Sequence, residues 1–159
     1  GPEDYRRVKM YKSIRNKRFV LTTSGNSFLN PTYVLDVVQG ILKCIGNKKA
    51  ENEIFNISSA EDITVKEYLS EIAKGLNVSL IHFNIGYPVS CFLATIIDRL
   101  THYIFHREGF VSKNKIDFLA MNHSTSCLKA QELLGYEPNY DFKIGFRETL
   151  RWCKNNKLL

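Results

Sequence analysis

The chain contains 159 residues, of which 44% are hydrophobic and 24% charged, and its formal net charge is +6. This length and composition are typical of one globular domain with its own core, and they exclude an intrinsically disordered chain. The longest apolar stretch, residues 88–97, ends before Asp98 and is too short to cross a bilayer, so no integral membrane protein is expected.

The positive charge is concentrated at the start of the chain. Residues 1–18 carry seven Lys and Arg against two acidic residues, and the remainder is nearly neutral. On a helix, Arg6, Lys9 and Lys17 fall on one side whereas Lys12 and Arg15 fall on another. Because this spread does not build a stripe that follows a phosphate backbone, no nucleic-acid partner is expected.

The four cysteines are widely and irregularly spaced, at Cys44, Cys91, Cys127 and Cys153. No pair forms a C-x-x-C motif, and no signal peptide opens the sequence. Free thiols in a reducing compartment are therefore expected, with a cytoplasmic location.

Hydrophobic periodicity and turn residues predict alternating helices and short strands. In chain order, the predicted elements are a helix at 4–16, a strand at 18–22, a helix beginning at Val37 and closed by Gly46, a strand at 53–57, a helix beginning at Thr64, a strand at 79–83, an apolar helix opened by Pro88, a short helix capped by Ser112, a helix at 127–134 capped by Ser126, and a terminal helix capped by Asp141.

Two of the predicted helix starts have a specific cap. Thr64 and Glu67 have the spacing of a capping box, in which each side chain accepts the backbone N–H of the other residue. Asp36 is predicted to be an N-cap rather than a catalytic acid. Both assignments place these polar side chains at helix ends.

The apolar helix after Pro88 carries many large side chains for one helix: Phe92, Leu93, Ile96, Ile97, Leu100 and Ile104. A helix lying on a membrane surface is one interpretation. Packing against a partner, or covering an apolar pocket, is preferred because basic residues do not line the polar side.

Three short, scattered strands cannot bury all of these apolar helix faces among themselves. The fold class expected is α/β, in the form of a mostly helical lobe whose few short strands complete a Rossmann-type sheet lying outside the chain. The whole range 1–159 is expected to form this one lobe.

Several short segments follow one another in an order that resembles the C-terminal region of extended short-chain dehydrogenase/reductase enzymes, the NAD-dependent epimerase/dehydratase family. The segments are Gly1-Pro2-Glu3-Asp4 before a basic helix, Phe19 to Gly25, Pro31-Thr32-Tyr33-Val34 with Asp36-Val37-Val38, Phe55-Asn56-Ile57-Ser58, Leu128-Lys129-Ala130 with Leu133-Leu134-Gly135-Tyr136-Glu137-Pro138, and Gly145 with Trp152. Gly1-Pro2 also fits the remnant of a protease cleavage site.

The resemblance implies an NAD(P)-dependent parent enzyme that binds a small-molecule substrate, and a homodimeric parent is one expectation. NAD or NADP would be bound mainly by residues outside this chain. The positions carried over are Gly1 and Pro2 beside the cofactor, and Arg6, Arg7, Leu21, Asn30 and Tyr33 beside the substrate, with the two arginines as phosphate contacts.

The sequence also departs from the family pattern. It contains no glycine-rich G-x-x-G-x-x-G turn for a cofactor pyrophosphate. Tyr5 and Lys9 have the Tyr-x-x-x-Lys spacing, but they follow the Gly-Pro turn, whereas the family's catalytic pair precedes it. No catalytic residue is therefore assigned within this chain.

A further departure concerns the substrate. Leu29 stands where sugar-nucleotide enzymes of the family often carry an arginine that holds a phosphate. The apolar helix after Gly86-Tyr87-Pro88 resembles the 3β-hydroxysteroid dehydrogenase and dihydroflavonol-reductase branch, whose substrates are more apolar.

Three functions remain open from the sequence. The first is the substrate-binding portion of an epimerase, dehydratase or reductase acting on a nucleotide sugar or a related carbinol or carbonyl compound. The second is a non-catalytic binding module derived from that lobe, and the third is a 3β-hydroxysteroid dehydrogenase-like oxidoreductase on an apolar substrate. His102 and His106 have a zinc-compatible spacing, but no third ligand is evident, so no metal is expected.

Overall fold

The computed structural model describes residues 1–59, 61–105 and 113–159. In chain order its elements are α1 (Tyr5–Arg15), β1 (Val20–Leu21), β2 (Phe28–Leu29), α2 (Val34–Cys44), the 3₁₀ turn η1 (Lys48–Ala50), β3 (Ile63–Thr64), α3 (Val65–Gly75), β4 (Ile81–His82), α4 (Tyr87–Phe105), α5 (Lys113–Ala120), α6 (Leu128–Leu134) and α7 (Phe142–Asn155). The expected mostly helical lobe with a few short strands is confirmed.

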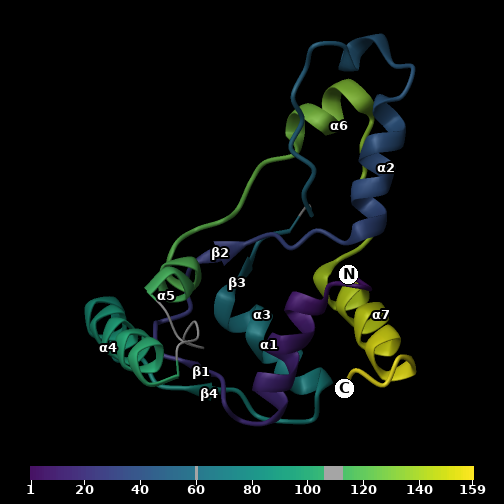
Figure 1. Cartoon of the computed structure of the whole chain (residues 1–159). Coiled ribbons are helices and arrows are strands. Elements are labelled where there is room, and N and C mark those ends of the chain that lie inside the picture. Colours follow the sequence, from purple (N-terminus) through teal and green to yellow (C-terminus); the bar gives the residue numbers. More distant parts are fainter. Residues whose placement is uncertain (60, 106–112) are drawn as a thin grey trace.

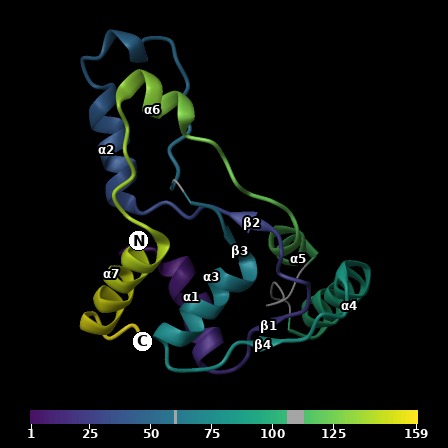
Figure 2. The same cartoon turned by 180° about the vertical axis from the view of Figure 1, so that it is seen from behind.

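Helices α1, α3 and α7 lie side by side (Figures 1 and 2) and enclose the larger hydrophobic core. We call these three helices together with their core the body. The helical spacing of apolar residues puts one face of each helix into this core. Leu69 and Ile72 on α3 are fully buried, and each contributes about 1.5–3 kcal/mol of hydrophobic stabilisation. The buried members are Val8, Tyr11, Ile14, Leu21, Leu29, Val65, Tyr68, Leu69, Ile72, Ala73, Leu76, Phe146, Leu150 and Cys153.

Side-chain caps begin all three helices of the body. The predicted capping box of Thr64 and Glu67 is present at α3, and its hydrogen bonds from Thr64 lower the pKa of Glu67. Asp141 caps α7 as predicted, and Asp4 caps α1. These oxygens occupy backbone N–H groups that the first turn of a helix otherwise leaves unpaired.

The strands form two separate pairs. β1 pairs with β4 in parallel, with Val20 opposite Ile81, and β2 pairs with β3 antiparallel, with Leu29 opposite Ile63. The strands predicted at 18–22 and 79–83 are confirmed, although each is shorter than its apolar run. Among the described residues, neither pair is extended by a third strand.

The strand predicted at 53–57 is absent. This segment crosses α6 without a strand partner in the described part of the chain, and Ile54 is 85% exposed. A strand exists only where a neighbour completes its backbone hydrogen bonds, so β-propensity alone was not sufficient here.

Helices α2 and α6 stand apart from the body and form what we call the arm (Figures 1 and 2). Their contact encloses a second, smaller core of Cys127, Ala130, Leu134 and Tyr136. The fully buried Tyr136 hydroxyl donates a hydrogen bond to the Ser58 carbonyl at 3.1 Å, which ties the arm to the segment before β3.

Asp36 is not an N-cap. Helix α2 begins earlier, at Val34, and its N-cap residue Tyr33 makes no side-chain capping bond. Asp36 is 1% exposed, and its two carboxylate oxygens accept the backbone N–H groups of Asn139 and Tyr140 at 2.9 and 3.2 Å. The carboxylate therefore satisfies buried donors of a remote turn rather than those of its own helix.

The other predicted caps have mixed outcomes. The N-cap residue of α6 is Cys127 rather than Ser126, although the Ser126 hydroxyl accepts the Leu128 N–H at 3.3 Å. Gly135 ends α6 in the left-handed conformation, as its position predicts. Ser112 lies outside the described residues.

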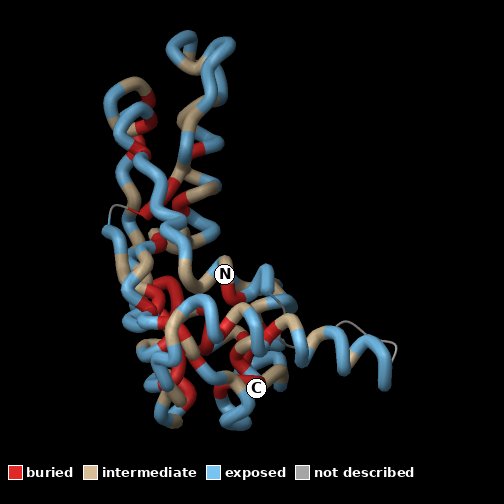
Figure 3. The backbone as a smooth tube through the Cα atoms, turned by 90° about the vertical axis from the view of Figure 1, so that its left-hand side faces the viewer, coloured by how far each residue is buried: buried red, intermediate tan, exposed pale blue. Residues whose placement is uncertain are grey.

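Two helices present apolar faces to solvent. On α2 the exposed residues recur at helical spacing, and on α4 most large apolar side chains are exposed. Figure 3 shows buried residues concentrated in the body, whereas α4, the helix that projects beside the grey segment, is largely exposed. The exposed stripe of α2 consists of Val34, Leu35, Val38, Ile41, Leu42 and Ile45.

All four cysteines are free thiols. Within residues 1–59, 61–105 and 113–159, no three His, Cys, Asp or Glu side chains come together in a way that could hold a metal ion. None of the described helices is both long and apolar enough to cross a membrane.

Candidate functional site

A cleft of about 460 Å³ opens where α1, α3 and α5 meet the segment that follows β2. Apolar side chains dominate its walls, and polar groups stand at its rim. Its lining residues are Arg7, Met10, Leu29, Asn30, Pro31, Tyr68, Leu69, Asn114, Lys115, Phe118, Leu119 and His123. A concave, mostly apolar cavity with a few polar groups is the usual form of a small-molecule site.

Asn30 fixes one edge of the cleft. Its amide nitrogen donates to the Thr125 carbonyl at 2.7 Å, and its amide oxygen accepts the Thr125 N–H at 3.2 Å. These paired bonds hold the segment after β2 against the chain that leads into α6. Because both polar atoms of the Asn30 amide are bonded to Thr125, Asn30 fixes the position of this wall of the cleft.

His123 and Phe118 form the wall contributed by α5 and the segment after it. Their rings stack at a centroid distance of 4.6 Å with an interplanar angle of 23°. The His123 N–H donates to the Phe28 carbonyl at 2.7 Å, and the Phe28 N–H donates to the Asn122 side chain at 2.8 Å. The backbone bond to β2 thus holds His123 in place, and the stacked rings of His123 and Phe118 line the cleft.

Arg7 and Tyr68 form the polar end of the cleft. The Arg7 Nη1 donates to the Tyr68 hydroxyl at 2.5 Å, and Arg7 Nε lies 3.6 Å from a carboxylate oxygen of Asp4. Burial raises the pKa of Tyr68 above its ordinary value of 10.0. Arg7 is half-exposed, and it already has two partners within the chain.

A smaller cavity of about 150 Å³ lies on the other side of this pair. Arg7, Pro31 and Tyr68 line both cavities, so the Arg7–Tyr68 pair separates them. The remaining lining residues are Gly1, Asp4, Tyr11, Thr32, Tyr33, Asp141, Phe142, Gly145, Phe146 and Thr149.

Tyr33 packs closely against α7 in the smaller cavity. Its ring lies 4.6 Å from that of Tyr140, and a Cβ atom at position 145 would lie only 2.9 Å from the Tyr33 ring. Glycine at 145 is therefore required for this approach. Most of the Tyr33 ring is therefore in contact with Tyr140 and with α7.

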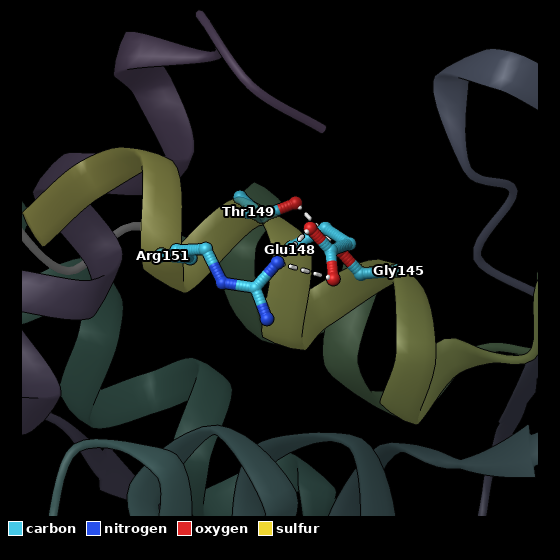
Figure 4. Close-up of polar contacts among 4 residues, drawn as sticks. All are labelled: Gly145, Glu148, Thr149 and Arg151. Carbon is cyan, nitrogen blue, oxygen red and sulfur yellow. Dashed lines mark hydrogen bonds and ion pairs between the residues drawn. The ribbon is translucent and has the colours of Figure 1, made fainter. Parts of the chain in front are cut away.

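Thr149 and the Glu148–Arg151 pair of α7 are bonded within the helix. Figure 4 shows the Thr149 hydroxyl reaching the Gly145 carbonyl, at 2.8 Å, and the Arg151 guanidinium pairing with Glu148, at 2.7 Å. Arg151 is thus held by its own helix, and it is not among the residues lining either cavity.

The structure brings some of the predicted site residues together. Arg7 and Asn30 lie at the larger cleft, and Gly1 and Tyr33 line the smaller cavity. Their contact with a ligand stays a prediction.

Three other predicted site residues lie elsewhere. Leu21 is fully buried in the core and lines neither cavity, and its predicted substrate contact stays a prediction. Arg6 points from the exposed side of α1, and Pro2 lies half-buried in the turn before α1. Neither lines one of the two cavities.

Sequence reasoning missed most of the apolar lining. Met10, Tyr68, Phe118 and His123 were not selected. A hydroxyl or imidazole group within an otherwise apolar face can indicate a residue beside a cavity, because buried polar groups need hydrogen-bond partners. The pairing that brings His123 beside β2 depends on long-range backbone bonds that the sequence pattern does not reveal.

Comparison with curated proteins finds relatives of low identity. The chain is 26% identical to an uncharacterised protein, y4nL, of Sinorhizobium fredii over 98% of this chain and 45% of that protein. It is 27% identical to a putative UDP-glucose 4-epimerase of Methanocaldococcus jannaschii, over 91% and 37% respectively. It is 26% identical to the sterol-4-alpha-carboxylate 3-dehydrogenase erg26 of Schizosaccharomyces pombe, over 70% and 33%.

Solved structures of epimerases share the fold of this chain. The epimerase Mth375 of Methanothermobacter thermautotrophicus superposes with a TM-score of 0.65 at 21% identity, over 94% of this chain and 37% of that one. A UDP-glucuronic acid 4-epimerase of Bacillus cereus, in complex with UDP-glucuronic acid and NAD, gives 0.60 at 16% identity, over 92% and 38%. The chain has the fold of the C-terminal part of an extended short-chain dehydrogenase/reductase.

The expected resemblance is therefore confirmed. No family model matches the sequence. The chain spans less than half the length of these relatives and structures.

Proposed function

We propose that residues 1–159 are the substrate-binding region of an NAD(P)-dependent epimerase, dehydratase or reductase, and that the cofactor-binding region belongs to a longer protein. The observation that carries the proposal is the cleft between α1, α3 and α5, which lies within a fold shared with the C-terminal part of NAD-dependent epimerases. Free thiols support a reducing, cytoplasmic location for this protein.

The surface of the arm supports a larger sheet in the intact protein. The exposed stripe of α2 is apolar along the helix, and a contiguous apolar face of this kind marks an interaction site. Beside it, residues 53–57 have the composition of a strand and no strand partner in the described chain. A sheet edge in the cofactor-binding region would pair with this segment and cover the stripe.

The chain's own residues do not fit a dinucleotide. A cofactor pyrophosphate needs open helix N-termini on glycine-rich turns, whereas α1, α3 and α7 are capped by Asp4, Thr64 with Glu67, and Asp141. Acidic side chains at these ends repel a phosphate. NAD or NADP would supply hydride transfer in the intact enzyme, and Gly1 and Pro2 remain proposed neighbours of the cofactor only.

For the substrate, the cleft favours an apolar carbinol or carbonyl compound. Met10, Leu69 and Phe118 line it together with other apolar groups, and burying them against a ligand contributes about 25 cal/mol per Å². One of the relatives is named a sterol dehydrogenase, which is consistent with this substrate class.

A nucleotide sugar is the alternative substrate class, because another relative is named a UDP-glucose 4-epimerase. A diphosphate would need a cation free to bind it bidentately. Arg7 is instead paired with Asp4 and Tyr68, and Leu29 lies in the cleft wall at the position where sugar-nucleotide enzymes of the family often carry an arginine.

A non-catalytic binding module is the second candidate function. The closed core of the body favours it, since the cleft rests on α1 and α3 and does not need a cofactor region to keep its shape. This module would bind the same ligands without turnover.

Expression of the coding sequence extended upstream, beside the 159-residue chain, tests the proposal. The extended product should bind NAD(P)H, measured by the change in its fluorescence, and should oxidise it in the presence of an apolar ring ketone. The 159-residue chain should show neither effect. An extended product that does not bind NAD(P)H would favour the module, and micromolar binding by the short chain would refute the assignment.

A further inference from the structure

Helix α4 is packed with its small and polar side chains toward α5 and the segment that follows β1. Ser90 and Ala94 are buried, and the Ser90 hydroxyl donates to the Thr22 and Gly86 carbonyls at 3.0 and 2.7 Å. Near the start of the helix, the Tyr87 hydroxyl donates to the Asp117 carboxylate of α5 at 2.8 Å. These bonds fix the rotation of α4, so the opposite face is held outward.

The outward face of α4 is apolar along its length. At 100° per residue its large side chains fall within an arc of about 140°. Their exposed fractions lie between 39% and 81%. The residues of this stripe are Val89, Phe92, Leu93, Ile96, Ile97, Leu100, Tyr103 and Ile104.

The stripe is different from ordinary exposed apolar residues. Single apolar side chains on a surface need no explanation, but a contiguous face of this size marks an interaction site. Asp98 and Arg99, the only Asp, Glu, Lys or Arg residues of α4, lie outside the arc. The face therefore carries no charge that would oppose contact with an identical face.

The spacing of the aliphatic residues is the same from either end of the helix. They stand at Val89, Leu93, Ile96, Ile97, Leu100 and Ile104, with intervals of 4, 3, 1, 3 and 4 residues. A two-fold axis between Ile96 and Ile97 brings each of these six side chains opposite another of the six on an antiparallel copy, whereas Phe92 and Tyr103 fall opposite Thr101 and Ser90. In an isologous interface residue i of one copy meets residue j of the other and the reverse, and this palindromic spacing fits that pattern.

We propose that α4 is a self-association surface, through which two copies of the chain pair antiparallel about an axis between Ile96 and Ile97. Val89 then lies opposite Ile104 of the second copy, and Leu93 lies opposite its Leu100. Eight exposed apolar side chains per copy supply on the order of the ~800 Å² per partner that a stable interface buries.

A lipid surface is the competing occupant of this face. Helices that lie on membranes carry Lys and Arg along the polar side, where they meet anionic headgroups. Helix α4 carries one Arg and one Asp, and its polar side faces α5 rather than the surface plane. The composition and the palindrome together favour the second copy, and they do so independently of the proposed enzymatic role.

Sedimentation of the 159-residue chain between about 1 and 100 μM tests the proposal. The unaltered chain should sediment as a dimer at the higher concentrations. Ile97→Glu, which places two buried charges at the axis, should shift it to monomer and weaken association by more than about 100-fold. The matched control is Ile41→Glu, on the exposed stripe of α2, which should leave the dimer unchanged.

A cysteine pair tests the antiparallel register. Leu93→Cys mixed with Leu100→Cys should give a covalent dimer under mild oxidation, whereas either variant alone and the unaltered chain should give little. Because both positions are exposed, circular dichroism should show unchanged folding. A chain that stays monomeric, a dimer that survives Ile97→Glu, or a monomer that instead sediments with phosphatidylglycerol vesicles would each overturn the proposal.

Discussion

The body and the arm are built from similar amphipathic helices, yet they bury their apolar faces to different extents. In the body, α1, α3 and α7 turn their apolar faces toward one another, and the core residues are almost fully buried. In the arm, α2 meets α6 through a small core and leaves its apolar stripe exposed. The body therefore holds itself together, whereas the arm presents a surface suited to a further partner.

The largest effect is expected from truncation within the body. Leu69→Ala removes a fully buried side chain and should lower the free energy of unfolding by roughly 2–5 kcal/mol in urea denaturation. The matched change in the arm, Ile41→Ala, should stay within about 0.5 kcal/mol, because that side chain is exposed. Equal losses at both sites would mean that the arm is covered in solution.

The next largest loss of stability is expected on removing the Asp36 carboxylate, which bonds α2 to the turn before α7. Asp36→Ala leaves the backbone N–H groups of Asn139 and Tyr140 without an acceptor, and should cost roughly 2–4 kcal/mol. Thermal unfolding followed by circular dichroism measures this loss. A change below about 0.5 kcal/mol would show that water replaces the carboxylate and that the anchor is dispensable.

A smaller effect is expected at Tyr136. Removing its bond to the Ser58 carbonyl by Tyr136→Phe should cost about 1 kcal/mol at neutral pH. Burial raises the pKa of Tyr136 to about 12, from its ordinary value of 10.0. The tyrosine's contribution is therefore complete below pH 10 and is lost as the pH rises through 12.

Urea denaturation of both proteins between pH 9 and pH 12 checks this dependence. The stability of the unaltered chain should fall more steeply than that of Tyr136→Phe. Parallel curves would show that the hydroxyl is solvated in the folded state.

Local patterns in the sequence predicted the body well. Apolar periodicity and the capping box of Thr64 and Glu67 depend on neighbours within a few residues, and both are present as predicted. The strand at 53–57 failed because strand formation needs a partner elsewhere. Asp36 failed as a cap because its bonding partners lie more than a hundred residues away in the chain.

The candidate site was predicted only in part for the same reason. Arg7 and Asn30 were selected through the family resemblance, and both lie at the cleft. Tyr68, Phe118 and His123 come from elements that meet only through long-range pairing with β2. Leu21 was also selected through the resemblance, and its side chain is fully buried in the core.

The claim that this chain carries an apolar substrate cleft can be tested through its two methionines. Met10 lines the cleft, whereas Met121 lies outside it, so methyl-labelled methionine gives one reporter and one internal control in a single spectrum. Titration with 1-decalone, a fused-ring apolar ketone, should shift the Met10 methyl signal saturably and leave Met121 unchanged. A Met10 signal that ignores the ketone, or that responds to UDP-glucose instead, would contradict the account.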